Sequence, residues 1–329
     1  MGRTGRVRAG VIIMAVMMML GCTGTAEIFV VPSPEPPAGN MTARPTPVPT
    51  AVPEETIIDH VHQPELYPAF SFRKDSKLFE IWFPNIKDAD AAVLVYDGQV
   101  WMIDCGDKGA AIRGSLLLRQ MEVKKVDVLI NTHPHHDHID GLAMTDDTAK
   151  VGEIRICFAP DLTESGLRMM ETAEEREIPV KEYRDGDCFS MGDGAVTLQV
   201  LKNNDDSLDM NNQSAVIRIV YGQRSILFTA DMEQPGQEAM VRRAGPDALK
   251  CDIVKYPHHA KSGMYEPFYE AMSARLAVVT SVEGRSNSGQ AFLKSKGLPA
   301  IYTSVKGLFT HLVTDGEYWL CEQVPVTVK

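Results

Sequence analysis

The sequence predicts a layered α/β fold with mixed sheets, and three features of residues 75–329 indicate it. Short apolar runs separated by turn residues come first and are typical of strands joined in hairpins. Further along, apolar runs of strand length alternate with segments of helical periodicity. The chain closes with two strand-like runs around Asp315-Gly316, a turn pair that favours a hairpin. Strands in hairpins followed by alternating strands and helices indicate stacked layers of both kinds.

The individual elements follow from the same patterns, taken in chain order. Strands are predicted at 78–83, 91–96, 99–106, 126–133, 214–222, 223–231, 251–259 and 275–281. Helices are predicted at 108–123, 161–176, 234–244, 265–273 and 289–296. A hairpin over 308–322 ends the domain, which we expect to extend over residues 65–329.

Residues 1–64 are predicted to lie outside this fold. Three arginines, a run of ten apolar residues and Gly21 describe a secretory signal over residues 1–21. Leu20-Gly21-Cys22 resembles a bacterial lipobox, which implies lipid attachment at Cys22 and an anchor on the outer face of the bacterial cell membrane. An ordinary signal peptide with a chance cysteine is the alternative. Eight prolines within 31–55 predict an extended tether over residues 22–64.

The charge and the cysteines limit the partners and the redox chemistry. Loss of the three arginines in residues 1–21 changes the net charge from −11 to −14, which argues against broad nucleic-acid binding. An odd number of cysteines follows Cys22, so at least one thiol stays free. Their widely spaced, mostly apolar settings favour small buried hydrophobes over disulfides: Cys105, Cys157, Cys188, Cys251 and Cys321.

The stretch NTHPHHDHIDGL, residues 131–142, contains four of the nine histidines of the chain. Crowded imidazoles repel one another when protonated, so metal binding explains them better than a histidine-rich surface loop. The stretch follows an apolar strand, and ligands just past a strand's carboxyl end lie at the functional edge of an α/β sheet. His133 and His135 can share one ion, while Asp137 and His138 turn to a second. These ligands favour Zn²⁺, with Mn²⁺ or Fe as alternatives.

This HxHxDH pattern resembles the metal-binding motif of the metallo-β-lactamase superfamily, and the resemblance covers about residues 78–322. It is most similar to the competence-protein (ComEC) type of domain, also seen in bacterial phosphorylcholine esterases. Further matches follow in order: Asp104-x-Gly106 after an early strand, Asp231 after a long hairpin, and the pair His258-His259. The resemblance implies a four-layer αββα sandwich with metals at one edge.

The resemblance also implies roles for individual residues. It assigns His133 and His135 to the first metal, Asp137, His138 and His258 to the second, and Asp231 to both. The two ions would activate a water molecule as hydroxide, with Asp137 contributing to catalysis. His259 would donate a proton to the leaving group or support a ligand from behind, and Asp104 would contact a ligand histidine. Substrate contacts are expected from Asn212, Ser214 and Lys261.

Two points about the metals stay open. Sequence does not decide which of His258 and His259 is the ligand. Many relatives also supply a third histidine to the first metal from the segment before the bridging aspartate, but residues 139–257 contain no histidine. Replacements by position are Asn203, Asn204, Asp205 and Asp206, none of which matches a ligand motif. Either one firm metal or two are compatible with this sequence.

The expected function is that of a membrane-anchored, extracytoplasmic metal-dependent hydrolase. Phosphodiester bonds in DNA, a nucleotide or a cell-surface polymer are the leading substrates, because two metals stabilise both the attacking and the leaving oxygens. The negative net charge favours a small or wall-bound substrate over long nucleic acid. Hydrolysis of a lactam, lactone or thioester is one alternative, and a non-catalytic metal-binding surface lipoprotein is another.

Overall fold

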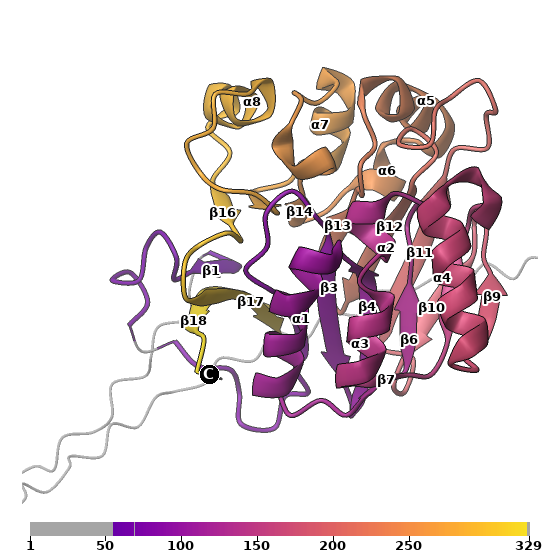
Figure 1. Cartoon of the computed structure of the whole chain (residues 1–329). Coiled ribbons are helices and arrows are strands. Elements are labelled where there is room, and N and C mark those ends of the chain that lie inside the picture. The colour runs from indigo at the N-terminus through magenta and orange to yellow at the C-terminus, as the bar shows by residue number, and fades with distance from the viewer. Residues whose placement is uncertain (1–54, 69, 328–329) are drawn as a thin grey trace, which may run out of the picture. The chain divides into compact units, whose positions relative to one another are not determined.

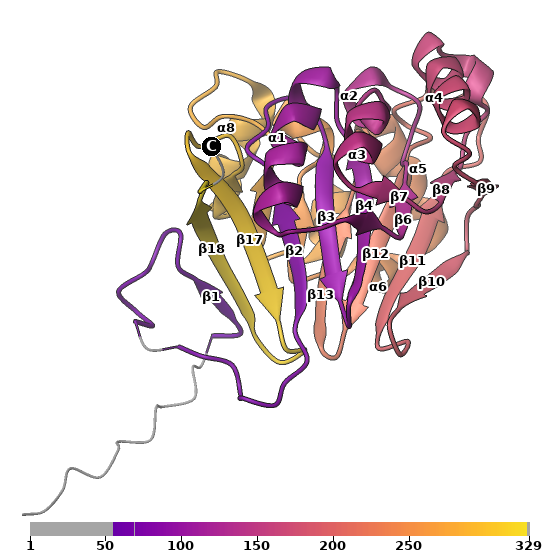
Figure 2. The same cartoon turned by 60° about the horizontal axis from the view of Figure 1, so that its bottom comes forward.

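Two β-sheets packed face to face form the centre of the structure, and helices cover the outer face of each (Figure 1, Figure 2). This computed structural model describes residues 55–68 and 70–327. The predicted signal segment, Cys22 and most of the predicted tether lie outside the described residues. Among the helices of the described part, none is long and apolar enough to cross a membrane.

The larger sheet, within the described residues, has nine strands in the order β1-β18-β17-β2-β3-β4-β6-β8-β9. Neighbours from β18 to β4 pair antiparallel, whereas β4, β6, β8 and β9 pair parallel, as does β1 with β18. The strands in chain order are β1 (Ile57–Asp59), β2 (Phe79–Phe83), β3 (Ala91–Tyr96), β4 (Gln99–Cys105), β6 (Val128–Ile130), β8 (Ile154–Ile156), β9 (Val180–Glu182), β17 (Leu308–Thr314) and β18 (Trp319–Pro325).

The smaller sheet has seven strands in the described part of the chain, in the sequential order β10 to β16. Pairing is antiparallel from β10 to β13 and parallel from β13 to β16. Its strands are β10 (Cys188–Met191), β11 (Val196–Lys202), β12 (Ala215–Tyr221), β13 (Arg224–Phe228), β14 (Ile253–Lys255), β15 (Leu276–Val279) and β16 (Ala300–Tyr302). A short parallel pair, β5 (Lys125–Val126) and β7 (Lys150–Val151), stands apart.

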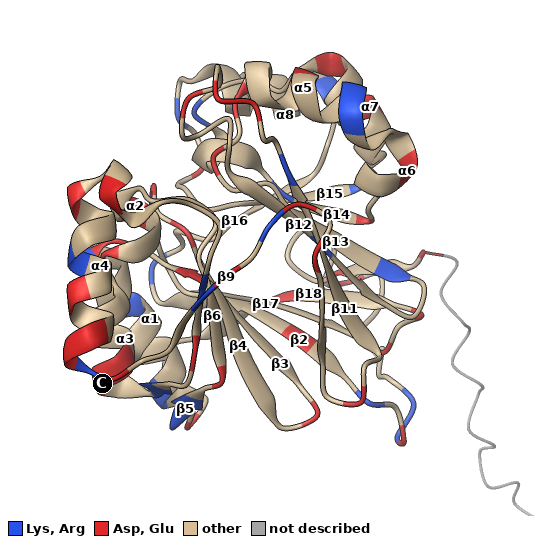
Figure 3. Ribbon diagram, turned by 90° about the vertical axis from the view of Figure 1, so that its right-hand side faces the viewer, with Lys and Arg blue, Asp and Glu red and all other residues tan. Residues whose placement is uncertain are grey.

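Helices α1 to α4 cover the larger sheet, and α5 to α8 cover the smaller one (Figure 3). The first group comprises α1 (Lys108–Gln120), α2 (His136–Ile139), α3 (Leu142–Thr148) and α4 (Glu164–Glu175). The second comprises α5 (Gln234–Ala244), α6 (Pro246–Leu249), α7 (Glu266–Met272) and α8 (Ser288–Lys296). Single 3₁₀ turns occur at η1 (Pro160–Leu162) and η2 (Pro257–Ala260).

Apolar side chains fill the three interfaces between these four layers. The central cluster lies between the sheets and includes Phe79, Leu94, Leu198 and Ile217. A second cluster lies under α1 to α4 and a third under α5 to α8. Strand β6 is buried on both faces, which explains its unbroken apolar run, and β14 is equally buried although it ends in Lys255.

The structure confirms the α/β fold class and the four-layer αββα sandwich expected from the sequence. Each predicted helix and strand corresponds to an observed element, and β17 and β18 form the predicted closing hairpin. Strands β1, β8, β9 and β16 are not predicted from the sequence because each has three residues, and β10 is not predicted because it is largely exposed. Strand β11 is also missed, although its first five positions alternate between more and less buried side chains. All five cysteines of the described residues are free thiols.

Candidate metal centre

Three loops carry the expected metal ligands, and each follows the carboxyl end of a strand. The HxHxDH loop follows β6, Asp231 follows β13, and the histidine pair follows β14. Strands β13 and β14 run parallel in the smaller sheet, so their carboxyl ends lie at one edge. The loop after β6 in the larger sheet faces the same edge, since its side chains contact those of the other two loops.

The HxHxDH loop separates buried from exposed histidines by turning into a helix. The chain is extended at His135, with ψ 151°, and the four-residue helix α2 begins at the next residue. As a result His133, Asp137 and His138 are buried, whereas the side chain of His136 is 68% exposed. The helix thus directs Asp137 and His138 inward together, and His136 takes no part in the site.

The histidine pair lies in a left-handed turn. His258, His259 and Ala260 have φ values of 49°, 52° and 59°, a conformation rare for residues other than glycine. The turn is held to the preceding loop by a hydrogen bond from His258 N to Ala230 O, 2.9 Å. Consecutive side chains consequently leave the backbone in different directions, and of the two histidines only His259 is fully buried.

Four buried side chains converge at the centre of this edge: Asp137, His138, Asp231 and His259. One ligand atom from each lies within 4.8 Å of those of the other three. Asp231 Oδ1 lies 3.2 Å from His138 Nε2 and 3.5 Å from His259 Nε2. His259 Nε2 lies 3.4 Å from Asp137 Oδ2. These separations suit atoms that surround one ion at about 2 Å.

The unpaired polar atoms of the cluster fit a metal ion. Oδ1 of Asp231 and the Nε2 atoms of His133, His138 and His259 are buried without a hydrogen bond, although buried polar atoms normally have one. Burial alone would raise the pKa of Asp231, but His259 and His138 hold it well below its usual value. An ionised carboxylate among imidazole nitrogens is a donor set that first-row divalent ions prefer.

The second ring nitrogen of each central histidine is held by a partner behind it. His138 Nδ1 lies 2.7 Å from Asp104 Oδ2, and Thr132 N donates to Asp104 Oδ1 at 2.8 Å. His259 Nδ1 lies 2.9 Å from the hydroxyl of Thr280. A hydrogen-bond acceptor behind the ring fixes the proton on Nδ1 and leaves the Nε2 lone pair for a metal. Asp104 therefore contacts His138, one of the expected ligands.

Comparison with known proteins assigns the fold and this site to a family. Residues 87–272 match the metallo-beta-lactamase superfamily. The chain belongs to the metallo-β-lactamase superfamily. This match covers the four central ligands of the metal cluster.

The individual proteins that match this chain are distant from it in sequence. "ComE operon protein 3" of Bacillus subtilis is 26% identical over 167 residues, which are 50% of this chain and 21% of that protein. A "Ribonuclease Z" of an Exiguobacterium species is 30% identical over 110 residues, which are 31% of this chain and 36% of that protein. The chain thus spans between a fifth and two fifths of the length of these relatives.

Solved structures with the same fold are also remote in sequence. The metallo-beta-lactamase fold protein YhfI from Bacillus subtilis is 12% identical with a TM-score of 0.46, covering 68% of this chain and 95% of that one. CmlA, a diiron beta-hydroxylase from Streptomyces venezuelae, is 13% identical with a TM-score of 0.46, covering 70% and 53%.

A second group of histidine nitrogens faces the other carboxylate oxygen of Asp231. Asp231 Oδ2 lies 3.5 Å from His258 Nε2 and 3.9 Å from His133 Nε2. The ring centroids of His133 and His135 are 4.8 Å apart. Asp231 therefore presents one oxygen to each group, which is the arrangement that a bridging carboxylate requires.

The structure brings His259, rather than His258, into the central cluster, a choice that the sequence leaves open. His259, expected as a proton donor, joins the central cluster with Asp137 and Asp231. His258, expected in that cluster, lies at the rim, with Nδ1 at 2.8 Å from Glu233 and Nε2 at 3.0 Å from Lys261 Nζ. The reason is the left-handed turn, which a sequence pattern of strand followed by loop does not reveal.

Two expected substrate contacts are structural instead. The Asn212 side chain is buried, and its oxygen accepts hydrogen bonds from Glu233 N and Gly236 N at the start of α5. Ser214 is fully buried, so a substrate does not reach it. Lys261 is exposed beside His258, where an anion has access to its ammonium group.

The proposed replacements for a third histidine also have other partners. Asn203 is buried and donates to Asn212 O and Gly236 O. Asp205 is exposed and accepts from Ser207 at 2.6 Å. Neither contact involves the metal cluster, so Asn203 and Asp205 are held by partners outside the first site.

Sequence reasoning missed a pocket that adjoins the metal centre. Its volume is about 240 Å³, and Thr132 and His133 form one side of it. The other lining residues are Pro134, Cys157, Phe158, Ala159, Leu162, Lys202, Met210 and Gln213. The lining contains no carboxylate and one lysine, Lys202. The residues come from four separate segments, which explains why no motif indicates the pocket.

Proposed function

We propose that this metallo-β-lactamase superfamily protein hydrolyses phosphodiester bonds. The observation that carries the proposal is the buried Asp231 carboxylate, whose two oxygens face separate groups of imidazole nitrogens. Divalent ions held there would act as Lewis acids toward phosphoryl oxygens and lower the pKa of a water molecule. A relative named ribonuclease Z supports a phosphodiester over a lactam, lactone or thioester.

The same contacts support one division of the ligands. The second metal would be held by Asp137, His138 and His259, the first by His133, His135 and His258, with Asp231 shared. Burial, aided by Lys261, lowers the pKa of His258, which keeps the imidazole neutral as a metal ligand requires. Glu233 fixes its Nδ1 proton from behind. His258 thereby takes the place of the histidine that is absent from residues 139–257.

The pocket beside His133 indicates the class of phosphodiester. Phe158, Leu162 and Met210 offer an apolar wall, and Lys202 offers one positive charge. A choline group carries a positive charge and is bound by aromatic cages, which a lining with one phenylalanine and a lysine does not provide. A neutral ring next to an anionic phosphate fits these residues better, so we favour a nucleotide unit over phosphorylcholine. The net charge of −11 disfavours extended contact with long nucleic acid.

The first experiment measures metal content and hydrolysis of bis(p-nitrophenyl) phosphate by the full-length protein. Asp137→Asn removes one ligand from the central cluster and should lower kcat by about 100-fold or more. His136→Ala is the matched control, because His136 lies in the same loop but is exposed. Equal loss in both variants, or wild-type protein with firmly bound metal and no turnover, would contradict the proposal.

A second experiment compares substrates that share one leaving group. Thymidine 5′-(p-nitrophenyl phosphate) and p-nitrophenyl phosphorylcholine differ only in the group that would occupy the pocket. We expect kcat/KM to be about tenfold higher for the thymidine ester, and Lys202→Met to remove that preference. A preference for the choline ester would favour a cell-surface substrate instead.

We also propose that the protein is anchored to the outer face of a bacterial membrane through Cys22. The support is the apolar run with its following Gly21-Cys22, which lies outside the described residues. Cys22→Ser should shift the protein from the membrane fraction to the soluble fraction of cells. Mass spectrometry of the wild-type amino-terminal peptide should show acyl chains on Cys22, and an unmodified thiol there would refute the anchor.

A further inference from the structure

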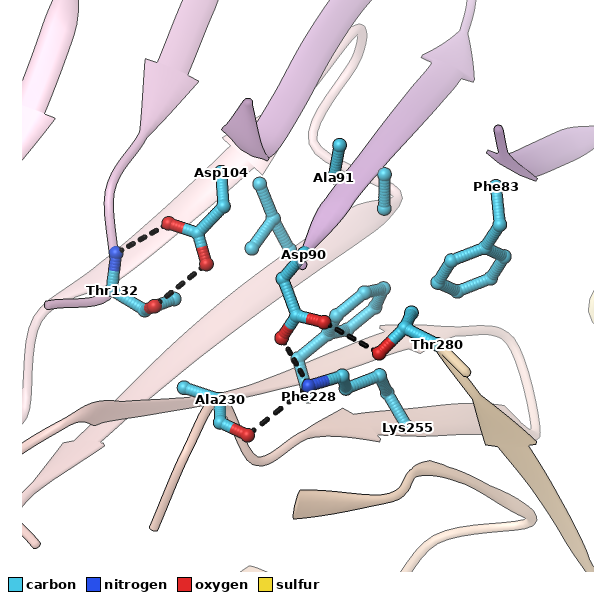
Figure 4. A pocket seen from close by; sticks show the side chains of 11 residues that line it. Phe83, Asp90, Ala91, Asp104, Thr132, Phe228, Ala230, Lys255 and Thr280 are labelled. Atoms are coloured by element: carbon cyan, nitrogen blue, oxygen red, sulfur yellow. Dashed lines mark hydrogen bonds and ion pairs between the residues drawn. The ribbon is translucent and has the colours of Figure 1, made fainter. Parts of the chain in front are cut away.

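A buried lysine and a buried aspartate outside the central cluster of four face each other near Asp104 (Figure 4). The aspartate, Asp90, also forms a smaller possible metal-binding group with Asp104 and His138. Lys255 ends β14 in the smaller sheet, and Asp90 immediately precedes β3 in the larger sheet. Their exposed fractions are only 2% and 6%. The Lys255 ammonium forms an ion pair with the Asp90 carboxylate and also donates to Ala230 O at 3.1 Å. The pair therefore joins the two sheets at the metal edge.

Main-chain contacts connect this ion pair to the loops that carry the ligands. Asp90 N donates to Asp137 O at 3.0 Å, next to His138. Ala230, the acceptor for Lys255, directly precedes Asp231. Thr229 in the same loop donates its hydroxyl to Lys255 O at 2.6 Å. A shift of either charged side chain would thus move ligands contributed by both sheets.

A side-chain relay runs from Asp90 to His259. Thr280 Oγ1 donates to Asp90 Oδ1 at 2.7 Å, because an ionised carboxylate only accepts. Its single proton is then committed, so the oxygen accepts from His259 Nδ1, 2.9 Å away. Asp90 Oδ1 itself also lies 3.2 Å from the same nitrogen. The relay places the imidazole proton on Nδ1 and leaves Nε2 unprotonated toward Asp137 and Asp231.

We propose that the Asp90–Lys255 ion pair is a positioning device for the metal centre. It holds the ligand loops of the two sheets together and fixes the orientation and tautomer of His259, both through Thr280 and through the direct contact of Asp90 with His259 Nδ1. Lys255 also offsets the charge of Asp90, which would otherwise add another buried carboxylate near Asp104 and Asp231. Buried ion pairs are not needed for stability as such, so this location indicates a role tied to the site.

The test uses three variants of the full-length protein. Lys255→Met removes the ion pair, and Thr280→Val interrupts the relay while keeping the pair. Arg224→Met is the matched control, because Arg224 forms a partly buried ion pair with Asp252 at 3.3 Å, at the opposite ends of β13 and β14. Zn²⁺ affinity is measured by competition with a chelator, and ligand geometry from the visible absorption spectrum of the Co²⁺-loaded protein.

Both Lys255→Met and Thr280→Val should weaken Zn²⁺ binding by about tenfold or more and change the Co²⁺ spectrum. Arg224→Met should lower the melting temperature but keep wild-type affinity and spectrum. Wild-type metal binding in Thr280→Val overturns the relay, even where Lys255→Met fails to fold. A loss of Zn²⁺ affinity in Arg224→Met equal to that in the other two variants would show that the Asp90–Lys255 pair contributes only to general stability. Wild-type protein without metal would instead refute the proposed function itself.

Discussion

At the scale of single residues, the turn at 258–260 determines what each histidine contacts. Three successive residues have positive φ, and each such residue other than glycine costs on the order of 1 kcal/mol. Main-chain hydrogen bonds from His258 N to Ala230 O and from Lys261 N to His258 O hold the turn in this conformation despite the cost. The strained backbone directs one imidazole to Asp137 and its neighbour to Glu233.

Alanine at either position of the pair should remove one metal and leave the other. His259→Ala deletes a ligand of the central cluster, and His258→Ala deletes the histidine facing Asp231 Oδ2. We expect each variant to contain about one metal per chain where the wild type contains about two, measured by elemental analysis. His136→Ala should retain both. Two metals in His258→Ala would show that His258 is not a ligand.

The sequence predicts which residue types bind the metals, but it does not predict how all of these residues are arranged. HxHxDH and the histidine pair are visible because imidazoles and carboxylates concentrate in short stretches, whereas Asp231 is indicated only by the resemblance to the family. Lys255 lies in an apolar strand and Asp90 beside a turn, so neither pattern indicates that they meet. The pair is formed by strands of different sheets separated by 165 positions in sequence. Only the tertiary structure brings such residues together.

At the scale of elements, the first turn of α8 supports the histidine turn. Gly289 lies so close to it that an added Cβ would be 2.0 Å from Ala260 O. The clash is with backbone, which does not move aside as a flexible side chain does. A helix without a side chain at this point therefore allows the turn to keep its conformation.

Gly289→Ala should destabilise the protein and weaken metal binding. The added methyl group would displace Ala260 and with it His259. Gly114→Ala in α1 is the control, because its Cβ meets nothing within 4 Å. That control should be neutral or stabilising by up to about 1 kcal/mol, as alanine favours helices. Chemical denaturation and Zn²⁺ titration of both variants would check this, and unchanged Zn²⁺ affinity in Gly289→Ala would contradict it.

A second set of elements, β2, β17 and β18, is joined by a histidine away from the metals. His311 stacks on Trp82 with ring centroids 3.7 Å apart. Its two ring nitrogens each lie 3.0 Å from a glutamate, Glu322 and Glu80. Burial opposes a charge on His311, but these two glutamates raise its pKa above 6.5. An imidazolium therefore links three neighbouring strands.

His311→Gln should lower stability most in mildly acidic solution. A raised histidine pKa stabilises the fold fully below the unfolded pKa of 6.5, and the gain is lost as pH rises through the folded pKa. His311 lowers the pKa values of Glu80 and Glu322 below 4.5, so their gain is lost as pH falls through those values. Within the range from pH 4.5 to 6.5, the unfolding free energy of the wild type should exceed that of His311→Gln by about 1 kcal/mol or more. A difference independent of pH would exclude the charged cluster.

At the scale of the whole molecule, the metal edge is where the two sheets share ligands. Asp137 and His138 belong to the larger sheet, whereas Asp231 and His259 belong to the smaller one. A metal ion held by these four residues would therefore crosslink the two halves of the sandwich. The layered α/β fold is predictable from the apolar patterns, and the αββα arrangement is implied by the resemblance to the family. Which strands of the two sheets face each other across the interface is not predictable from the sequence, because both sheets present similar apolar surfaces.

Removal of metal should lower the stability of the whole domain. At free metal 100 times the dissociation constant, binding stabilises the folded state by about 2.7 kcal/mol. A chelator should therefore lower the melting temperature of the full-length protein, and added Zn²⁺ should restore it. The chelator should have little effect on Asp231→Asn, which lacks the shared carboxylate charge. Equal melting temperatures with and without chelator in the wild type would show that metal does not join the sheets.

Strand β1 has a mechanical consequence for the chain that precedes it. Ile57–Asp59 pairs with β18, and further hydrogen bonds run from Trp319 N to Thr56 O and from His60 N to Cys321 O. A force applied to the chain before Thr56 acts first on these hydrogen bonds between β1 and β18. In the sheet order, five strands separate β1 from β6, whose loop carries the metal ligands. Tension from the amino-terminal side thus enters the domain at an edge remote from the metal centre, where it can be borne without disturbing the ligands.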